Sequence, residues 1–290
     1  MHPAPSLILF TVLSGTGFGL LVWLGIGLRA PTGIAAFVLF GLGYALTGAG
    51  LIAAAFHLGH PERALLAFTQ WRSSWLSREA VLAAATLAIM APHAASSTFA
   101  ATPLPFFGWL GAALALATIL ATAMIYAQIR AVPRWHHWST PPVFLLAALA
   151  GGALLAAQTG LALALLLALA LAMVAHWVFG DRQFAASGST TGSATGLGGP
   201  GRVRLLEPPH SGRNYLLREM VHVVGRKHAR KLRLLALGLG ALVPAAVLLL
   251  PASHATIILA CGLHLAGLLA QRWLFFAEAE HVVGLYYARA

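Results

Sequence analysis

Long, almost uninterrupted apolar stretches follow one another along this chain, and they restrict its fold more than any other feature. A helix needs about 20 mostly apolar residues to cross the hydrocarbon layer of a bilayer. An open sheet cannot satisfy its backbone hydrogen bonds inside lipid, so such stretches must be helices. The sequence therefore predicts an all-α, polytopic integral membrane protein with eight transmembrane helices. The predicted spans are residues 6–28, 33–57, 79–97, 106–129, 142–158, 160–179, 234–250 and 254–276.

The composition agrees with a single membrane domain over residues 1–290. Apolar residues make up 59% and charged residues 9%, whereas soluble domains carry about a quarter charged residues. The single cysteine, Cys261, excludes a cysteine-ligated iron–sulfur cluster within this chain, because such clusters need about four thiolates. The net charge of +11 comes mostly from loops beside the spans. This placement indicates contact with anionic lipids or a partner rather than with nucleic acid.

The distribution of Lys and Arg predicts the orientation of the chain. With eight spans, both termini lie on one side of the membrane, together with the second, fourth and sixth loops. Seventeen Lys and Arg residues fall on that side, and only Arg29 falls on the other. Basic loops remain in the cytoplasm. We therefore expect a multi-pass protein of the bacterial cytoplasmic (inner) membrane with both termini in the cytoplasm.

The sixth loop is the one sizeable polar region between the predicted spans. Residues 181–213 are predicted to form a flexible cytoplasmic loop, because Gly, Ser and Thr are frequent there. Residues 214–233 are predicted to form a basic amphipathic segment, with a helix that lies in the membrane interface. Binding of anionic lipid and docking of a partner subunit both agree with this segment.

Residues 57–79, the second loop with the span ends beside it, hold the main candidate site. His57 ends one predicted span and Glu79 begins the next, so both are expected at the same edge of the hydrocarbon layer, where ionisable groups mark function. A titratable histidine and a carboxylate among aromatic side chains suit the proton-coupled chemistry of a quinone. The predicted quinone-binding residues are His57, Arg63, Trp71, Arg72, Trp75, Arg78 and Glu79.

A purely structural role for these residues stays open. Glu79 lies near the start of a predicted helix, where the helix dipole favours a carboxylate and Ser77 is a candidate N-cap. In that case Glu79 would pair with Arg63 or Arg78 and would only anchor the helix.

Two histidines inside predicted spans raise haem as a rival cofactor. His264 is predicted near the middle of its span and His176 near the cytoplasmic end of another, so their depths do not match. A hydrogen bond between helices is the better interpretation for each. We therefore expect no haem and no metal site in this chain.

The chain resembles the membrane-anchor subunits of dimethyl sulfoxide reductases. The resemblance is carried by His57-Leu-Gly-x-Pro-x-Arg63-Ala64, by Ser74-x-Leu76-Ser77-x-Glu79, and by Val132-Pro133-x-Trp135 followed by Trp138-x-x-Pro141. It implies an anchor for an iron–sulfur subunit with four clusters and for a molybdopterin catalytic subunit. It also implies electron exchange with ubiquinone or menaquinone, no haem, and a quinol site at His57 and Glu79.

The sixth loop, between Ala194 and Glu219, is more similar to the anchors of cytoplasmic sulfite-oxidising relatives. The expected function is therefore electron transfer to the quinone pool from sulfite oxidation in the cytoplasm. A quinol-oxidising anchor of a reductase is the alternative, and a secondary transporter is more remote because the charges avoid the midplane. The predicted partner-docking residues are Arg63, Arg72, Arg78, Arg130, Arg134 and Arg218.

Overall fold

The computed structural model describes residues 2–199, 201, 203, 204, 206, 207, 220 and 228–287, and in this part of the chain all regular elements are helices. The longer helices are α1 (Pro5–Gly25), α2 (Gly33–Ala55), α3 (Trp75–Ala95), α4 (Pro105–Ala127), α5 (Thr140–Leu155), α6 (Thr159–Ala186) and α12 (His254–Ala277). The shorter helices are α7 (Thr191–Thr195), α10 (Ala229–Leu237) and α11 (Val243–Val247). Two 3-10 helices, η1 (Pro61–Phe68) and η4 (Val282–Tyr287), and two π-helical segments, η2 (Ser96–Ala100) and η3 (Gly238–Leu242), complete the set.

Six helices of the described chain are long and apolar enough to cross a membrane: α1, α2, α3 continued by η2, α4, α6 and α12. They match six of the eight predicted spans. The fifth predicted span corresponds to α5, which has 16 residues. The seventh corresponds to α10, η3 and α11, which follow one another without a break over residues 229–247. By length and apolarity, six helices can cross a membrane. Helix α5 and the segment 229–247 are not among the helices that are long and apolar enough by the same measure.

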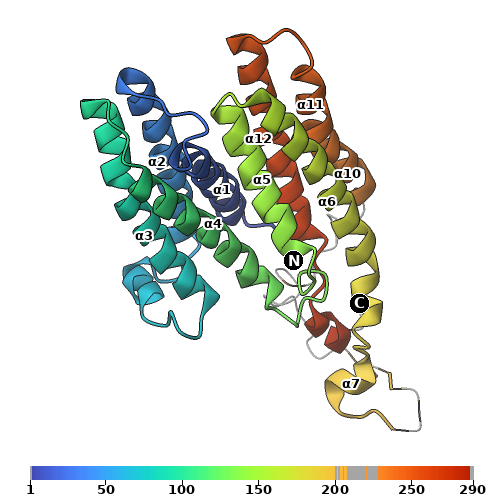
Figure 1. Cartoon of the computed structure of the whole chain (residues 1–290). Helices are drawn as coiled ribbons and strands as arrows, with labels where there is room; N and C mark the ends of the chain where they lie inside the picture. Colours follow the sequence, from blue (N-terminus) through green and yellow to red (C-terminus); the bar gives the residue numbers. More distant parts are fainter. Residues whose placement is uncertain are drawn as a thin grey trace.

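The helices form one bundle with α1 at its centre, where α1 contacts α2, α4 and α5 (Figure 1). Close approach of backbones makes this possible. A Cβ atom on Gly19 of α1 would lie 1.8 Å from the carbonyl oxygen of Ala148 of α5, and one on Gly152 would lie 2.1 Å from the carbonyl carbon of Gly19. Small residues allow such contacts between membrane helices. The glycines of α1 and α5 thus form a small-residue face at this crossing.

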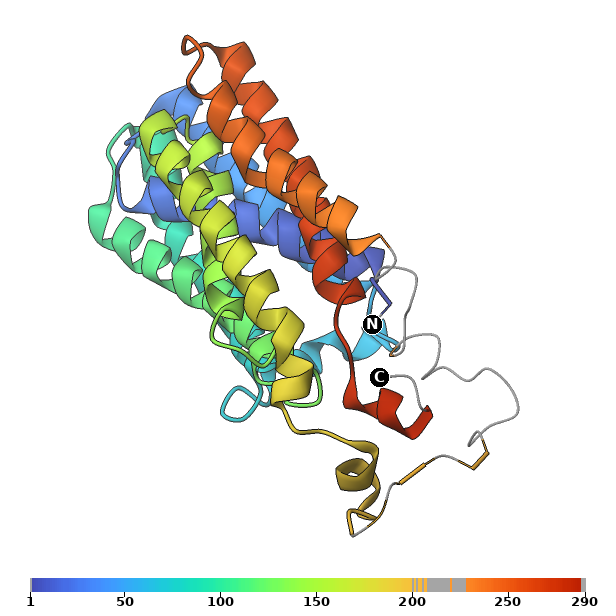
Figure 2. The same ribbon diagram turned by 90° about the vertical axis from the view of Figure 1, so that its right-hand side faces the viewer.

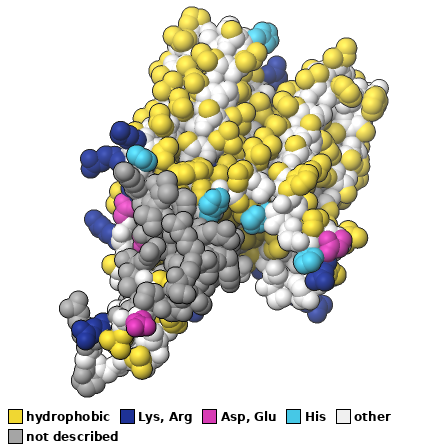
Figure 3. Space-filling view, turned by 180° about the vertical axis from the view of Figure 1, so that it is seen from behind, with side chains coloured by type: hydrophobic (Ala, Val, Ile, Leu, Met, Phe, Trp, Pro, Cys, Tyr) yellow, Lys and Arg dark blue, Asp and Glu magenta, His cyan; other side chains and the backbone are white. Residues whose placement is uncertain are grey.

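One end of the bundle carries η1, residues 128–139, α7 and η4, and we call it the basic end (Figures 1 and 2). The start of α1 also lies at this end. In Figure 3, hydrophobic side chains cover most of the helical body, and most of the visible charged side chains gather toward the basic end. A surface that is apolar along its length and charged at one end suits a protein embedded in lipid.

An ion-pair network, which we call the clamp, joins four segments at the basic end. Asp181 of α6 accepts two hydrogen bonds from Arg233 of α10, at 2.6 and 2.8 Å, and one from Arg134 at 2.6 Å. Arg233 also donates to Glu278, the C-cap residue of α12, at 2.7 Å. Bidentate arginine–carboxylate pairs of this kind are strong and directional. The clamp therefore fixes the end of α6 relative to α10 and α12.

Two predicted boundaries differ from the structure. The N-cap of α3 is Ser74 rather than Ser77, because the Ser74 hydroxyl accepts from the Ser77 amide, and Glu79 therefore lies in the second turn. Helix α6 continues to Ala186, so the predicted loop from residue 181 begins later. The tight turn before α6 depends on Ala157, which has a φ of 55°. The predicted interfacial helix, at residues 214–224, lies almost wholly outside the described residues.

Candidate functional site

Glu79 of α3 is buried against α4 and accepts a hydrogen bond from the Thr122 hydroxyl. It belongs to the inward face of α3, since Ala83, Thr86 and Met90 recur below it at helical spacing and are also buried. Thr86 continues the same α3–α4 contact, with its hydroxyl 3.2 Å from that of Thr118. A carboxylate held inside a bundle needs such a partner, because burial without one is costly. Glu79 is thus part of the interior rather than of the surface.

Arg272 of α12 is the second buried ionisable group near this point. Its side chain is 2% exposed, and its guanidinium carbon lies 3.5 Å from the ring centroid of Phe144 of α5. Its Nη1 atom is buried and has no hydrogen-bond partner among the described residues. Tyr126 of α4, one helical turn after Thr122, stacks on the same Phe144 ring, with centroids 5.6 Å apart. We call Glu79, Thr122, Tyr126 and Arg272 the polar cluster.

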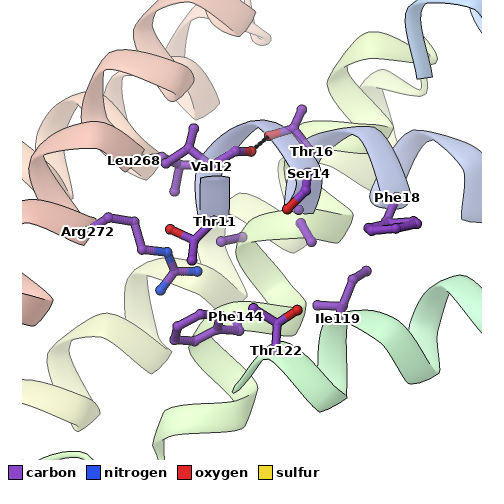
Figure 4. Close-up of a pocket in the computed structure, with 13 residues that line it drawn as sticks. Thr11, Val12, Ser14, Thr16, Phe18, Ile119, Thr122, Phe144, Leu268 and Arg272 are labelled. Carbon is purple, nitrogen blue, oxygen red and sulfur yellow. Dashed lines mark hydrogen bonds between the residues drawn. The ribbon is translucent and has the colours of Figure 1, made fainter. Parts of the chain in front are cut away.

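A small enclosed cavity lies beside the polar cluster, between α1, α4, α5 and α12. Thr11, Phe144, Thr122 and Arg272 converge on it from these four helices (Figure 4). It offers about 10 Å³ to the centre of a water molecule, which is about the room that one water needs. The cavity in this form is therefore too small for a quinone ring.

An aromatic group packs around Tyr126 of the polar cluster and reaches the loop between α4 and α5. The ring of Tyr126 packs against Trp135, Phe144, Phe275 and Phe276, with centroids 5.3 to 5.6 Å apart. Trp135, in the loop between α4 and α5, donates its indole N–H to the backbone oxygen of Phe275 at 2.9 Å. Such packing excludes water and strengthens the electrostatic interactions behind it.

The other predicted quinone-site residues lie at the surface of the basic end. His57, just beyond α2, is exposed, as are Arg63 in η1 and Trp71 and Arg72 in the following turn. Among the described contacts none joins His57 to Glu79. His57 and Glu79 lie at the same end of the bundle, as expected, but His57 faces outward and Glu79 faces inward.

Arg78 organises the segment that leads into α3. Its guanidinium lies over the ring of Trp75, 4.4 Å from the centroid, and donates to the backbone oxygens of Trp71 and Arg72 at 3.0 and 2.7 Å. Arg72 in turn lies over the ring of Trp71 at 5.4 Å. These cation–π contacts and hydrogen bonds hold the tryptophans beside the start of α3.

The predicted docking arginines fall into three groups. Arg63, Arg72 and Arg130 are exposed at the basic end. Arg134 is bound within the clamp, and Arg78, in the first turn of α3, donates to backbone oxygens of the preceding turn, so both guanidinium groups already have partners in the chain. Arg218 lies outside the described residues. Their role in docking stays a prediction.

The two membrane histidines form the predicted interhelical hydrogen bonds. The Nδ1 atom of His264 lies 2.6 Å from the carbonyl oxygen of Gly240 in η3. The Nδ1 atom of His176 lies 3.0 Å from the hydroxyl of Ser139, which precedes α5. Over the described part of the chain, no three His, Cys, Asp or Glu side chains gather as metal ligands would.

Sequence reasoning missed Arg272, Tyr126 and Thr122. Arg272 was counted among the basic residues of the cytoplasmic side, but it is buried in α12. A signal was present, because a charged residue near the end of an apolar span marks a functional site. Tyr126 and Thr122 gave no such signal in the sequence, because single polar residues are common at helix–helix contacts.

The sequence of this chain is similar to known proteins of one family. The family model of the DMSO reductase anchor subunit (DmsC) matches residues 1–178. One of the sulfite dehydrogenase subunits of Allochromatium vinosum is 34% identical to this chain, over an alignment that covers 99% of each. No solved structure matches the chain.

Proposed function

Because the chain belongs to the DMSO reductase anchor subunit family, we propose that it is the quinone-reactive anchor of a three-subunit molybdopterin and iron–sulfur oxidoreductase. An iron–sulfur subunit with four clusters would dock on the basic end, with the molybdopterin subunit beyond it. Electrons would pass between that subunit and ubiquinone or menaquinone at the membrane. The chain itself would hold neither haem nor an iron–sulfur cluster.

The buried carboxylate of Glu79 is the observation that carries this proposal. Reduction of a quinone consumes two electrons and two protons, so the site must supply protons as well as hydrogen bonds. Glu79 lies in the interior with a hydroxyl partner, Thr122, at the end of the bundle where His57 is exposed. We propose that Glu79 passes protons to the quinone and that His57 connects the site with water. Trp71, Trp75, Arg63, Arg72 and Arg78 would border its mouth.

The proposed source of electrons is sulfite oxidised in the cytoplasm. The relative in Allochromatium vinosum is named as part of a sulfite dehydrogenase, and its alignment extends over the sixth loop as well as the helices. The alternative is a quinol-oxidising anchor of a terminal reductase, and the name of the family model favours it. The two differ in the direction of electron flow and share the same quinone site.

The proposed topology has eight spans with both termini in the cytoplasm. Helix α5 and the segment 229–247 run alongside the longer helices in Figure 1, which supports counting them as spans. The excess of Lys and Arg at the basic end supports its cytoplasmic placement in a bacterial inner membrane.

Replacing Glu79 by Gln in the assembled complex tests the quinone site. We expect the three subunits to remain together and reduction of a soluble dye by the molybdopterin subunit to continue. Quinone-coupled turnover should fall about 100-fold or more, since a positioned acid or base contributes about 10²–10⁴-fold. Glu62→Gln is the matched control, because that carboxylate is exposed in η1. Unchanged quinone turnover in Glu79→Gln would refute the assignment.

A further inference from the structure

The cavity beside the polar cluster contains an unusual combination of groups. Arg272 points into it with a buried Nη1 atom that has no partner among the described residues. The face of Phe144 attracts the guanidinium but gives this N–H no acceptor. Buried polar groups are nearly always hydrogen-bonded to protein or to an ordered water. The space at Nη1 fits one water molecule and little else.

The opposite wall of the cavity leads to Glu79. Thr122 lines the cavity and donates its hydroxyl hydrogen to the Glu79 carboxylate, so its oxygen is left as an acceptor on the cavity side. The hydroxyl of Thr11, on α1, donates to backbone oxygens of its own helix and likewise has acceptor capacity left. A water between Nη1 and these oxygens would complete a chain from the cation to the carboxylate.

We propose that Arg272 is a positioning residue for Glu79, acting through one water molecule held in this cavity between the guanidinium and the Thr122 hydroxyl. This rests on the proposed role of Glu79 in quinone reduction. When the iron–sulfur partner has delivered electrons, the O–H bond of Glu79 breaks and an O–H bond forms at the quinone oxygen. The carboxylate that remains is offset by the Arg272 cation until a proton from water restores the acid.

The charges around Glu79 leave Arg272 as the cation suited to this task. Helix α4 contributes the phenol of Tyr126, which stacks on Phe144, and α1 and α5 present hydroxyl and apolar groups to the cavity. On α6, the ring of His176 stacks on Phe275 of α12, and its Nδ1 atom lies 3.0 Å from the Ser139 hydroxyl. Among the groups that line this cavity, Arg272 carries the fixed positive charge. The other arginines near this end are engaged elsewhere: Arg78 with the backbone oxygens of Trp71 and Arg72, and Arg134 and Arg233 with the carboxylates of the clamp.

Infrared spectroscopy of the complete complex in lipid tests the coupling. The carboxyl signal that disappears in Glu79→Gln belongs to Glu79, and its pH titration can be followed in further variants. Removing a nearby cation favours the protonated carboxyl. In Arg272→Gln we expect the signal to persist to higher pH by about one unit or more, a tenfold change in proton affinity. The alkaline limb of quinone-coupled turnover should move by the same amount.

Companion variants keep the test decisive. Arg272→Lys retains the charge and should titrate like the unmodified protein, and Arg29→Gln, at the opposite end of the bundle, should change nothing. If Arg272→Gln fails to assemble, Thr122→Val should still move the titration of Glu79, because it removes the hydroxyl that completes the chain. An unchanged titration of Glu79 in assembled Arg272→Gln, or in Thr122→Val where Arg272→Gln fails to assemble, would overturn the proposal. The proposal would also be overturned if Arg272→Gln weakened the binding of a quinol-analogue inhibitor and left the titration of Glu79 unchanged. That result would make Arg272 a quinone ligand.

The outcome separates this inference from the proposed function. The titration reports whether Arg272 acts on Glu79 even if Glu79 takes no part in quinone chemistry. Normal quinone turnover in Glu79→Gln would refute the proposed function alone, whereas an unmoved Glu79 titration would refute the coupling alone.

Discussion

The hydroxyl of Thr122 on α4 donates a hydrogen bond to the carboxylate of Glu79 on α3, and neither side chain reaches the surface of the bundle. This contact lies where α3 and α4 pack against each other, close to the basic end. It holds the carboxylate against Thr122, which also lines the cavity that Arg272 enters. A surface anchor at a helix start would need no such contact.

Thr122→Ser and Thr122→Val separate the hydroxyl from its methyl group. Serine keeps the donor, and we expect quinone-coupled turnover within a factor of about three of the unmodified complex. Valine keeps the shape and removes the donor, so the buried carboxylate loses its partner at a cost of about 1–3 kcal/mol. We expect turnover in Thr122→Val to fall about tenfold or more. Equal turnover in the two variants would show that the hydrogen bond does not matter.

The close crossing of α1 and α5 depends on glycines, which have no side chain at the contact. Gly152→Val would place carbon atoms where the backbone of Gly19 now lies, so the helices must separate. Overpacking typically costs about 1–3 kcal/mol, and a backbone contact leaves little room to relax. We expect a lower midpoint of thermal unfolding in detergent and loss of assembled complex. Gly160→Val is the control, because nothing lies within 4 Å of a Cβ there.

The clamp predicts a difference between its two carboxylates. Glu278 is 4% exposed and Asp181 is 46% exposed, although both bind Arg233. Breaking a buried pair leaves an uncompensated charge and costs about 3–5 kcal/mol, whereas an exposed pair contributes about 1 kcal/mol or less. Glu278→Gln should therefore lower the unfolding midpoint clearly more than Asp181→Asn. The reverse order would mean that the exposed, bidentate contact dominates the clamp.

Much of the fold follows from the sequence because apolar length fixes where a membrane helix begins and ends. The starts of α2 and α12 agree closely with the predicted spans, and α3 passes Pro92 and continues through η2. Span length cannot set the register of the last turn, so the N-cap at Ser74 was missed.

The candidate site was predictable only in part, because depth in a bilayer does not determine the direction of a side chain. The predicted depth of Glu79 and His57 agrees with their common end of the bundle. Glu79 turns inward because it shares a face of α3 with Thr86 and Met90, whereas His57 lies beyond the last turn of α2. The contact between Arg272 and Phe144 joins residues far apart in sequence, and no local pattern announces it.

Charge reversal at the basic end tests the docking surface. Arg63 and Arg72 are exposed there, and we expect them to face acidic residues of the iron–sulfur subunit. Such charges chiefly set orientation and association rate. Arg63→Glu combined with Arg72→Glu should release the soluble subunits from membranes, most clearly at low salt, where screening is weakest. Arg29→Glu, at the opposite end, should leave them bound. Equal release by both changes would argue against docking at the basic end.

Cysteine labelling at Thr195 tests the side of the membrane on which the basic end lies. Thr195 ends α7 and is exposed, and the neighbouring Ala194 is held to η4 through the hydroxyl of Tyr286. Positive-inside bias acts most strongly on short loops near spans, and most of the basic residues meet that condition. After Cys261 is replaced, we expect Thr195→Cys to resist a membrane-impermeant reagent in intact cells and to react once the membrane is opened. Thr32→Cys, in the turn before α2 at the other end, should react in intact cells. Ready labelling of Thr195→Cys from outside would place the docking surface outside the cytoplasm and would favour an exported reductase over cytoplasmic sulfite oxidation.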